Sequence, residues 1–344
     1  MKISVGLDIG FSTIKVVALD KDGKQPELVS LGSIASPQPG IVSDTDTDLE
    51  VVASTLKKLL EASKIEQKEI TAAIPESKVF TRVIDDLPFL KDSELPAAIR
   101  YASEEFIPMP IAEVELNWQI LFRSNEKEQN GRTVVFVVAS PKTLVDKYLK
   151  MFNMAGLVPK ALETEIVAIV RSLVGNNPLS PTSLIIQMGA MTTDMAVVSK
   201  GTILLTRSVS TGGFALTRAL SQYFNFELTQ AEEYKKTYGI TKNQLEGKVF
   251  EALKPVMDVI MAEVRRVIQA FGAKYPQNPI KRVILSGGGA KLPGLVIFMA
   301  NQLGLEVQEA DPWLFIGKNK NLSEKLAADA PRYSVAVGLA LREE

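Results

Sequence analysis

Apolar and polar residues alternate in short blocks at the start of the chain. Residues 3–9 and 14–20 are mainly apolar, and the short turn between them predicts a β-hairpin. A third strand is expected near residues 27–34. Between residues 49 and 63 apolar positions recur at helical spacing, and residues 70–75 are typical of a short buried strand. Three strands, a helix and a strand indicate half of a layered α/β domain.

The same order returns in the second half of the chain. Residues 184–198 predict another hairpin, residues 202–208 a third strand, and the apolar stripe over 247–273 a long helix. A strand is expected at 282–285 and a final helix at 333–341. This internal duplication predicts two similar lobes with a cleft between them.

A segment in the first half departs from this plan. Residues 79–156 predict strands and helices of a small α+β unit, and a helix over Ala161–Val174 leads out of the first lobe. We therefore expect an α/β chain with two lobes and one insert. The expected boundaries are 1–78 with 157–180 and 325–344 for the first lobe, 79–156 for the inserted subdomain, and 181–324 for the second lobe.

Composition restricts the chemistry more than the fold. The 344 residues carry a net charge of −1, so nothing suggests binding to nucleic acid. The chain has no histidine and no cysteine, which excludes disulfides, thiolate metal sites and every Ser-His or Cys-His mechanism. No run approaches the ~18 apolar residues that a membrane-spanning helix needs, and the N-terminus does not read as a signal peptide. We therefore expect a cytoplasmic protein.

The turn of the first hairpin carries candidate ligands for phosphate and metal. Asp8 ends the first strand, and a carboxylate there can hold Mg²⁺ through water. The N–H group of Gly10 and the hydroxyls of Ser12 and Thr13 are candidate phosphate donors, and Lys15 can reach a terminal phosphate. The alternative interpretation is a tight turn with a solvated Asp8 and a surface Lys15.

The second hairpin repeats this motif with one replacement. Gly189, Thr192 and Thr193 are again candidate phosphate donors. The position that corresponds to the acid of the first hairpin holds Gln187, which supplies no negative charge for a metal. Asp194 keeps a carboxylate on the returning strand, where a structural role is the alternative.

Two glycine-rich turns precede helices in the second half. Gly212 and Gly213 form one of them, and Gly287, Gly288 and Gly289 form the other. Glycines allow the backbone to approach a ligand closely, and a helix start favours an anion or a nucleoside. Such turns often have no role except to turn the chain.

Several charged residues complete the candidate site. Glu232 and Lys235 lie three residues apart on one predicted helix and are candidates to flank a ribose or a base, although a surface ion pair is the simpler interpretation. Glu163 and Glu165 lie at the exit of the first lobe, where either is placed to orient an attacking water. With Gln187 they are the candidates for a catalytic role.

The order of these motifs along the chain resembles the actin/Hsp70/sugar-kinase superfamily of ATP-binding proteins. Val5–Gly10 resembles its first phosphate motif, and Gln187–Asp194 its second, which normally opens with an aspartate. Leu285–Ala290 resembles its adenosine motif, and Tyr333–Ala340 its second connecting helix. The resemblance implies a two-lobed actin-like (ribonuclease H-like) fold that binds ATP and Mg²⁺.

Within the superfamily the chain is most similar to the FtsA/PilM branch, and to the PilM proteins of type IV pilus assembly in particular. The insert resembles the subdomain 1C of this branch, with Leu87-Pro88 before its helix and Glu104–Pro108 closing it. Ala231–Lys235 followed by Tyr238-Gly239 also matches. The acid missing at Gln187 puts nucleotide hydrolysis in doubt.

The resemblance implies a cytoplasmic ATP-binding scaffold of the pilus, or a related secretion, assembly platform at the inner membrane. Its expected partner is the N-terminal peptide of a PilN-like membrane protein, and its ATPase activity is expected to be weak or absent. Two alternatives remain: an FtsA-like division filament and a small-molecule kinase. The sequence ends at Glu344 without the amphipathic membrane helix of FtsA proteins, so direct insertion into the membrane is not expected.

Overall fold

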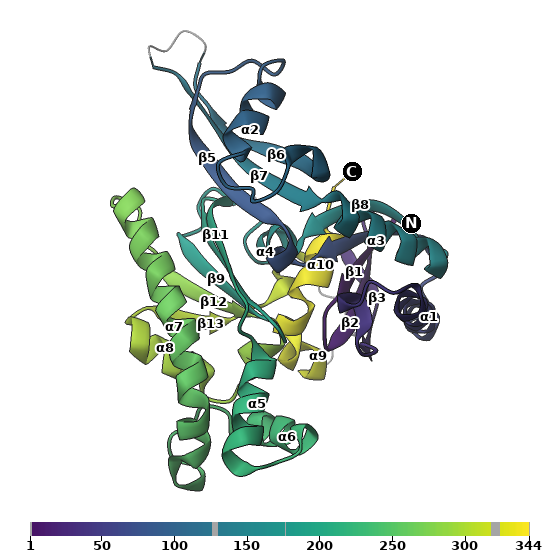
Figure 1. Cartoon of the computed structure of the whole chain (residues 1–344), viewed down its shortest axis with the longest axis vertical. Coiled ribbons are helices and arrows are strands. Elements are labelled where there is room, and N and C mark those ends of the chain that lie inside the picture. Colours follow the sequence, from purple (N-terminus) through teal and green to yellow (C-terminus); the bar gives the residue numbers. More distant parts are fainter. Residues whose placement is uncertain (1, 126–129, 176, 318–323, 344) are drawn as a thin grey trace.

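The computed structural model describes residues 2–125, 130–175, 177–317 and 324–343. In these ranges the chain forms two five-stranded sheets and one three-stranded sheet (Figure 1). The strands of the first sheet are, in spatial order, β3 (Glu27–Ala35), β2 (Thr13–Asp20), β1 (Ile3–Ile9), β4 (Glu69–Ile74) and β8 (Val158–Thr164). The β1–β2 and β2–β3 pairs are antiparallel, whereas β4 runs parallel to β1 and β8.

The second sheet repeats this topology. Its strands are, in spatial order, β11 (Thr202–Val209), β10 (Thr193–Ser199), β9 (Ser183–Met188), β12 (Arg282–Ser286) and β13 (Glu306–Glu309). Two antiparallel pairs are again followed by two parallel pairs. The predicted duplication is therefore present as two lobes of one design.

Two helices lie between the sheets. They are α4 (Glu165–Leu173) and α10 (Ser334–Ala340), and both are buried on several sides. α4 packs against Ala73 of the first sheet and Ile185 of the second within one hydrophobic cluster. The helices cross so closely that a Cβ added to Gly338 would lie 1.8 Å from the carbonyl oxygen of Ala168. Glycine at this position therefore sets the distance between α10 and α4.

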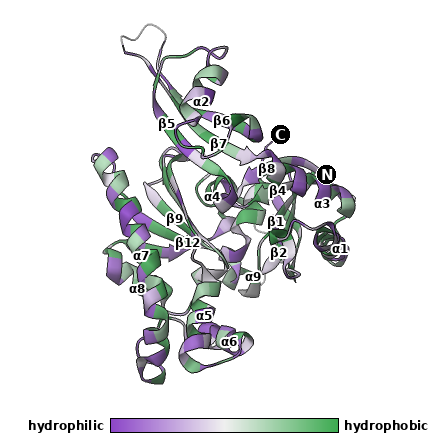
Figure 2. Cartoon of the chain, in the orientation of Figure 1, coloured by the Kyte–Doolittle hydropathy of each residue, from purple (hydrophilic) through white to green (hydrophobic). Residues whose placement is uncertain are grey.

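Separate helices cover the outer faces of the sheets. On the first lobe these helices are α1 (Asp46–Ala62) and α3 (Lys142–Ala155). On the second lobe they are α5 (Gly213–Phe224), α6 (Leu228–Tyr238), α7 (Lys248–Lys274) and α8 (Leu295–Leu303). Figure 2 shows hydrophobic and hydrophilic residues mixed along α7, as expected of a helix with one buried face. A short helix, α9 (Glu324–Ala328), precedes α10.

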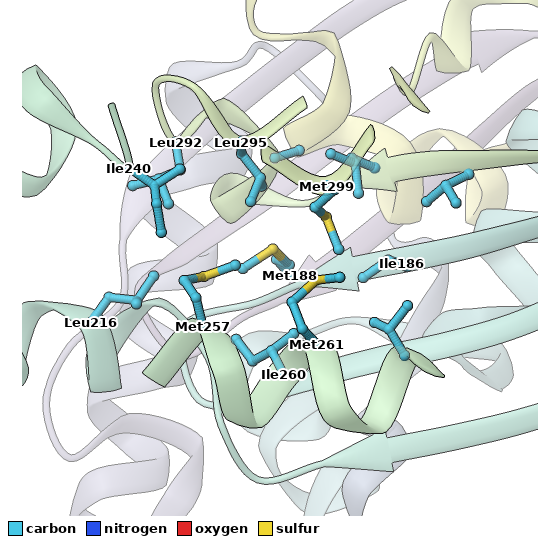
Figure 3. Close-up of a cluster of buried hydrophobic side chains, with 14 of the residues drawn as sticks. Ile186, Met188, Leu216, Ile240, Met257, Ile260, Met261, Leu292, Leu295 and Met299 are labelled. Atoms are coloured by element: carbon cyan, nitrogen blue, oxygen red, sulfur yellow. The ribbon is translucent and has the colours of Figure 1, made fainter. Parts of the chain in front are cut away.

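The core of the second lobe is rich in methionine. Met257 and Met261 of α7 and Met299 of α8 are buried with Met188, the last residue of β9 (Figure 3). Methionine fills irregular gaps because its side chain is unbranched. This packing supports the end of β9, from which the second hairpin turn begins.

The inserted subdomain is an antiparallel sheet covered by one helix. Its strands are, in spatial order, β5 (Phe80–Pro88), β7 (Arg132–Pro141) and β6 (Val114–Arg123), and the helix is α2 (Leu95–Ser103). β5 faces the second lobe, where Asp85 forms an ion pair of 2.7 Å with Lys274 at the end of α7. β6 forms the opposite edge of the sheet.

Two expectations from the sequence are changed by the packing. The helix predicted over Ala161–Val174 begins only at Glu165, because residues 158–164 pair with β4 as an edge strand. The helix α3, which falls inside the expected 79–156 insert, packs instead in the core of the first lobe through Tyr148 and Phe152.

The chain also returns to the first lobe earlier than expected. Trp313 and Ile316 pack with Val17 and Leu19 of β2. We therefore propose that the insert ends near residue 141 and that the second lobe ends before Trp313. The remaining boundaries stay predictions.

Candidate functional site

The first hairpin turn (Gly10, Phe11 and Ser12) is flanked by a buried ion pair. Asp8 of β1 and Lys15 of β2 are register partners, and Lys15 Nζ donates a hydrogen bond to Asp8 Oδ2 at 2.9 Å. Only 4% of Asp8 and 9% of Lys15 are exposed. The alternative of a solvated aspartate and a surface lysine is therefore wrong. Asp8 remains a predicted metal ligand, and Lys15 is the cation that the structure places beside it.

At the second hairpin turn, residues 189–192, the charges are arranged differently. Gln187 of β9 and Asp194 of β10 are register partners, so the acid lies on the returning strand. Asp194 accepts hydrogen bonds from Thr192 Oγ1 at 3.0 Å and from Ser208 Oγ at 2.5 Å. Gln187 Oε1 is buried and has no hydrogen-bond partner among the described residues. The two hairpins therefore share a backbone shape but not an electrostatic pattern.

The start of α5 closes over the second turn. The N–H group of Gly213 donates to the carbonyl oxygen of Gly189 at 2.9 Å. A Cβ on Gly212 would lie 2.7 Å from that same oxygen, so only glycine fits there. The Thr193 hydroxyl is fully buried and donates to the carbonyl oxygen of Thr211 at 2.7 Å. Contrary to expectation, Thr193 therefore offers no hydroxyl to a phosphate, and Gly212 has a packing role.

Three carboxyl groups lie close enough between the lobes to influence one another: Glu76 and Asp194 are buried, and Glu165 is half-buried. Glu165 at the start of α4 accepts a hydrogen bond from the N–H group of Glu76 at 3.4 Å. Burial, with Asp194 nearby, raises the pKa of Glu76 to about 7. Burial raises the pKa of Glu165 well above its ordinary value, and the charges of Asp194 and Asp8 add to this effect. Burial also raises the pKa of Asp194. The cluster therefore favours protonated carboxyl groups.

Glu76 links this cluster to the contact between the lobes. Its Oε1 accepts a hydrogen bond from Thr81 Oγ1 at 2.9 Å, and the Thr81 hydroxyl lies 2.9 Å from that of Thr206 in the second lobe. Its Oε2 is buried and has no partner among the described residues. Glu76 was not among the candidate site residues predicted from the sequence. The available signal was an acid just after the end of a buried parallel strand, which is where ligands of open α/β sheets bind.

Glu163, which the sequence placed with Glu165 at the exit of the first lobe, is not part of this cluster. Both of its carboxylate oxygens accept hydrogen bonds from Arg171, at 2.8 and 2.9 Å, and Arg342 forms a further ion pair with it. A bidentate pair of this kind holds both side chains in place. Glu163 therefore has a structural role, which corrects its assignment as a candidate for orienting water. Glu165 and Gln187 remain candidates.

The glycine-rich turn 287–289 lies directly beside the end of β9. A Cβ on Gly287 would lie 2.5 Å from the carbonyl oxygen of Met188, and one on Gly289 would lie 2.5 Å from the Met188 side chain. A Cβ on Gly288 would meet no atom within 4 Å. Gly287 and Gly289 are thus required by packing, whereas Gly288 has open space in front of it.

Glu232 and Lys235 form a network at the start of α5. Lys235 Nζ donates hydrogen bonds to Glu232 at 2.6 Å, to Thr217 at 2.8 Å and to the carbonyl oxygen of Gly213 at 3.0 Å. Burial opposes ionisation of Glu232, but hydrogen bonds from Lys235 and Thr217 outweigh it and lower the pKa. The pair is therefore more than a surface ion pair, and it lies beside the diglycine turn.

The described residues limit what the site can hold. No group of three or more carboxylates within them is arranged as a complete metal site. A cation at Asp8 would therefore need oxygen ligands from water or from a bound phosphate. Separately, no helix in the described ranges has the length and apolar character that crossing a membrane requires.

The chain is similar to proteins of known family and structure. The family of type IV pilus assembly protein PilM matches residues 6–344. The chain belongs to the PilM family. The structure of a PilM–PilN type IV pilus biogenesis complex is similar over 98% of both chains, with a TM-score of 0.86 and 29% identity. The expected resemblance to PilM proteins is confirmed.

More distant relatives agree with this assignment. The cell division protein FtsA of Enterococcus hirae is 22% identical over 88% of this chain and 79% of its own length. MreB5 of Spiroplasma citri bound to AMPPNP has a TM-score of 0.56 and 14% identity, over 98% of this chain and 95% of the other. With the PilM match, these likenesses confirm the two-lobed actin-like fold.

Proposed function

We propose that this PilM-family protein is an ATP-binding scaffold of the pilus inner-membrane assembly platform, with little or no hydrolysis. The proposal of nucleotide binding rests on two hairpin turns of duplicated lobes that are brought near each other by the contact of Phe11 with Phe214, and on a glycine turn with open space at Gly288. MreB5, a protein of the same fold, was solved with AMPPNP. Localisation at the inner membrane would follow from a membrane partner.

The residues present fit a nucleotide in most respects. Lys15, the Ser12 hydroxyl and N–H groups at the tip of the first hairpin turn would contact phosphate oxygens. The N–H groups of Gly10 and Gly189 already donate to the carbonyl oxygens of Thr13 and Thr192, and would have to give up these hydrogen bonds to reach a phosphate. Glu232 and Lys235 would lie near the sugar or base, and Gly288 would lie under the nucleoside. When bound, ATP with Mg²⁺ would supply a charged group that both lobes contact. Asp8 would hold the cation through water.

Weak hydrolysis follows from two side chains near the second turn. Gln187 is an amide, so it adds no charge to hold a cation or to polarise water. Burial raises the pKa of Glu165, so this side chain is protonated more often than an exposed glutamate, and a protonated carboxyl group accepts no proton from water. The lobes would therefore hold ATP without efficient turnover, and binding would stabilise one lobe arrangement.

Isothermal titration with Mg-ATP tests the nucleotide part. The wild type should bind, and Gly288→Val should bind much more weakly because its side chain would fill the open space under the nucleoside. Gly272 of α7 also has no atom within 4 Å of an added Cβ but lies on an outer helix, so Gly272→Val is the matched control. Absence of both heat and thermal stabilisation with the wild type would contradict ATP binding.

The partner is proposed to be the N-terminal peptide of a PilN-like inner-membrane protein, docked beside the inserted subdomain. Support comes from the similar PilM–PilN complex and from β6, an edge strand. Trp118, Ile120 and Phe122 are apolar side chains of β6 that are 37–49% exposed. An extended peptide can pair with such an edge and cover such a row.

Fluorescence anisotropy with a labelled peptide tests this docking. The peptide would be the cytoplasmic N-terminus of the PilN-like protein from the same organism, with a scrambled peptide as control. Trp118→Asp should weaken binding, whereas Tyr101→Asp, which changes an exposed aromatic residue of α2, should not. Equal affinities of both variants for the peptide would exclude β6 as the docking edge.

A second candidate function is an FtsA-like filament, because FtsA of Enterococcus hirae matches most of the chain. Sedimentation with ATP and lipid vesicles separates the two functions. Pelleting polymers would favour the filament. A species that stays in the supernatant and captures the PilN-like peptide would favour the scaffold.

A further inference from the structure

An aromatic contact joins the two lobes at the hairpin turns. Phe11 lies at the tip of the first hairpin turn, and Phe214 is the second residue of α5. Their ring centroids are 6.2 Å apart and their planes are inclined by 53°. This separation and tilt lie in the range that favours aromatic pairs. The contact connects segments more than two hundred residues apart in the sequence.

Backbone hydrogen bonds hold each ring at its turn. The N–H group of Phe214 donates to the carbonyl oxygen of Ala190 at 2.8 Å, which ties the ring to the second hairpin turn. In the first turn, the carbonyl oxygen of Phe11 accepts from Gln38 Nε2 at 3.0 Å. The N–H group of Ser36 also donates to the carbonyl oxygen of Ser12 at 3.0 Å. The backbone from which each ring extends is therefore fixed at its own turn.

The outer side of Phe214 is in contact with a cation. The guanidinium carbon of Arg218, one helical turn further along α5, lies 5.9 Å from the ring centroid. Phe214 and Arg218 also line a pocket of about 330 Å³, together with Met191 and Val256. Phe214 thus contacts both a ring of the first lobe and a charged side chain of its own helix.

We propose that Phe11 and Phe214 form an interlobe clasp, which keeps the two hairpin turns together and slows exchange of a ligand held between them. Neither ring can bind a phosphate, and their effect is to hold the turns in register and to exclude water. For a nucleotide as the ligand, the proposal rests on the proposed function. The contact between the lobes stands on its own.

Cross-linking tests the clasp without nucleotide. The chain has no cysteine, so Ser12→Cys with Ala215→Cys introduces a unique pair next to the two rings and keeps both rings in place. A short bifunctional thiol reagent should join this pair quickly within one chain, as seen by a mobility shift on denaturing gels. The control pair is Ser12→Cys with Tyr223→Cys, an exposed position near the end of α5. Adding Phe214→Ala to the first pair should slow its cross-linking. Equal cross-linking rates of the two pairs would overturn the clasp.

Stopped-flow release of a fluorescent ATP analogue tests the effect on exchange. Phe11→Ser and Phe214→Ala should each raise the dissociation rate, by roughly up to tenfold if the whole pair energy is lost. The double variant should release the analogue no faster than the faster single variant, because one contact is removed only once. Tyr223→Ala is the control. Unchanged release from both single variants would overturn the gating role.

The two experiments separate two kinds of failure. If the wild type binds no nucleotide analogue, the proposed ATP binding fails, whereas the cross-linking result still decides whether the clasp exists. If the analogue binds and both single variants release it at the wild-type rate, ATP binding stands and the gating role fails.

Discussion

Asp8 and Lys15 form a buried ion pair across the first hairpin, with 2.9 Å between Lys15 Nζ and Asp8 Oδ2. In the second hairpin the same two positions hold Gln187 and Asp194. The duplicated lobes have therefore diverged at the two positions where charge matters most, while the strand register around them is unchanged.

Removing the lysine should destabilise the fold strongly. Lys15→Met leaves Asp8 buried without its cation, and loss of one partner of a buried pair costs about 3–5 kcal/mol. The double variant Asp8→Asn with Lys15→Met should recover much of this loss, because no uncompensated charge remains. Urea denaturation at neutral pH measures both free energies of unfolding. A double variant as unstable as Lys15→Met would show that the ion pair is not the cause.

Glu76 should make stability depend on pH. Its pKa rises from 4.5 to about 7 in the folded protein, so the folded state binds the proton more tightly than the unfolded state. Stability from this group is complete below pH ~4.5, falls as pH rises through ~7, and is then constant, with a total loss of up to about 3 kcal/mol. The groups that face Glu76 are Asp194, Thr81 and Thr164, with Glu165 accepting from its N–H group.

The variant Glu76→Gln should remove this contribution, because an amide does not titrate. Its free energy of unfolding should change less between acidic and alkaline pH than that of the wild type. A remaining slope is expected from Glu165 and Asp194, whose pKa values burial also raises. Parallel pH profiles of the variant and the wild type would contradict the role of Glu76.

Two glycines in helices should respond in opposite ways to alanine. Gly338→Ala places a methyl group 1.8 Å from the backbone of Ala168, so α10 must move away from α4. Overpacking of this kind costs about 1–3 kcal/mol or more. Gly272→Ala in α7 meets no neighbour and should stabilise by roughly 0.5–1 kcal/mol, as expected for glycine in a helix interior. Thermal denaturation compares the two, and similar melting temperatures would contradict the close crossing.

Restoring the missing acid should increase turnover. Gln187→Asp places a carboxylate where the superfamily normally carries one, and we expect ATP hydrolysis to rise above that of the wild type. Release of inorganic phosphate from Mg-ATP measures this change, with Gln187→Glu as a control of equal charge and greater length. No gain with Gln187→Asp would mean that this residue does not limit hydrolysis.

The hairpins, the long helix α7 and the duplication could be predicted because they depend on local periodicity. The helix expected from Ala161 was wrong at its start, because pairing with β4 outweighs local propensity in residues 161–164. Glu76 and Thr193 show that a local pattern also fails to predict which partner a side chain will have at the site. A hydroxyl beside a turn and an acid after a strand have several possible partners, and the sequence pattern does not select among them.

The two-lobed α/β plan, the superfamily motifs and the absence of histidine and cysteine chemistry can be read from residue type and spacing alone. The folded chain was needed to show that Glu76, Glu165 and Asp194 lie close together, that Glu163 pairs with Arg171, and that Phe11 contacts Phe214. These contacts join segments far apart in the chain. They form because α4 and α10 pack between the two sheets and set the distance between them. That distance cannot be inferred from spacing along the sequence.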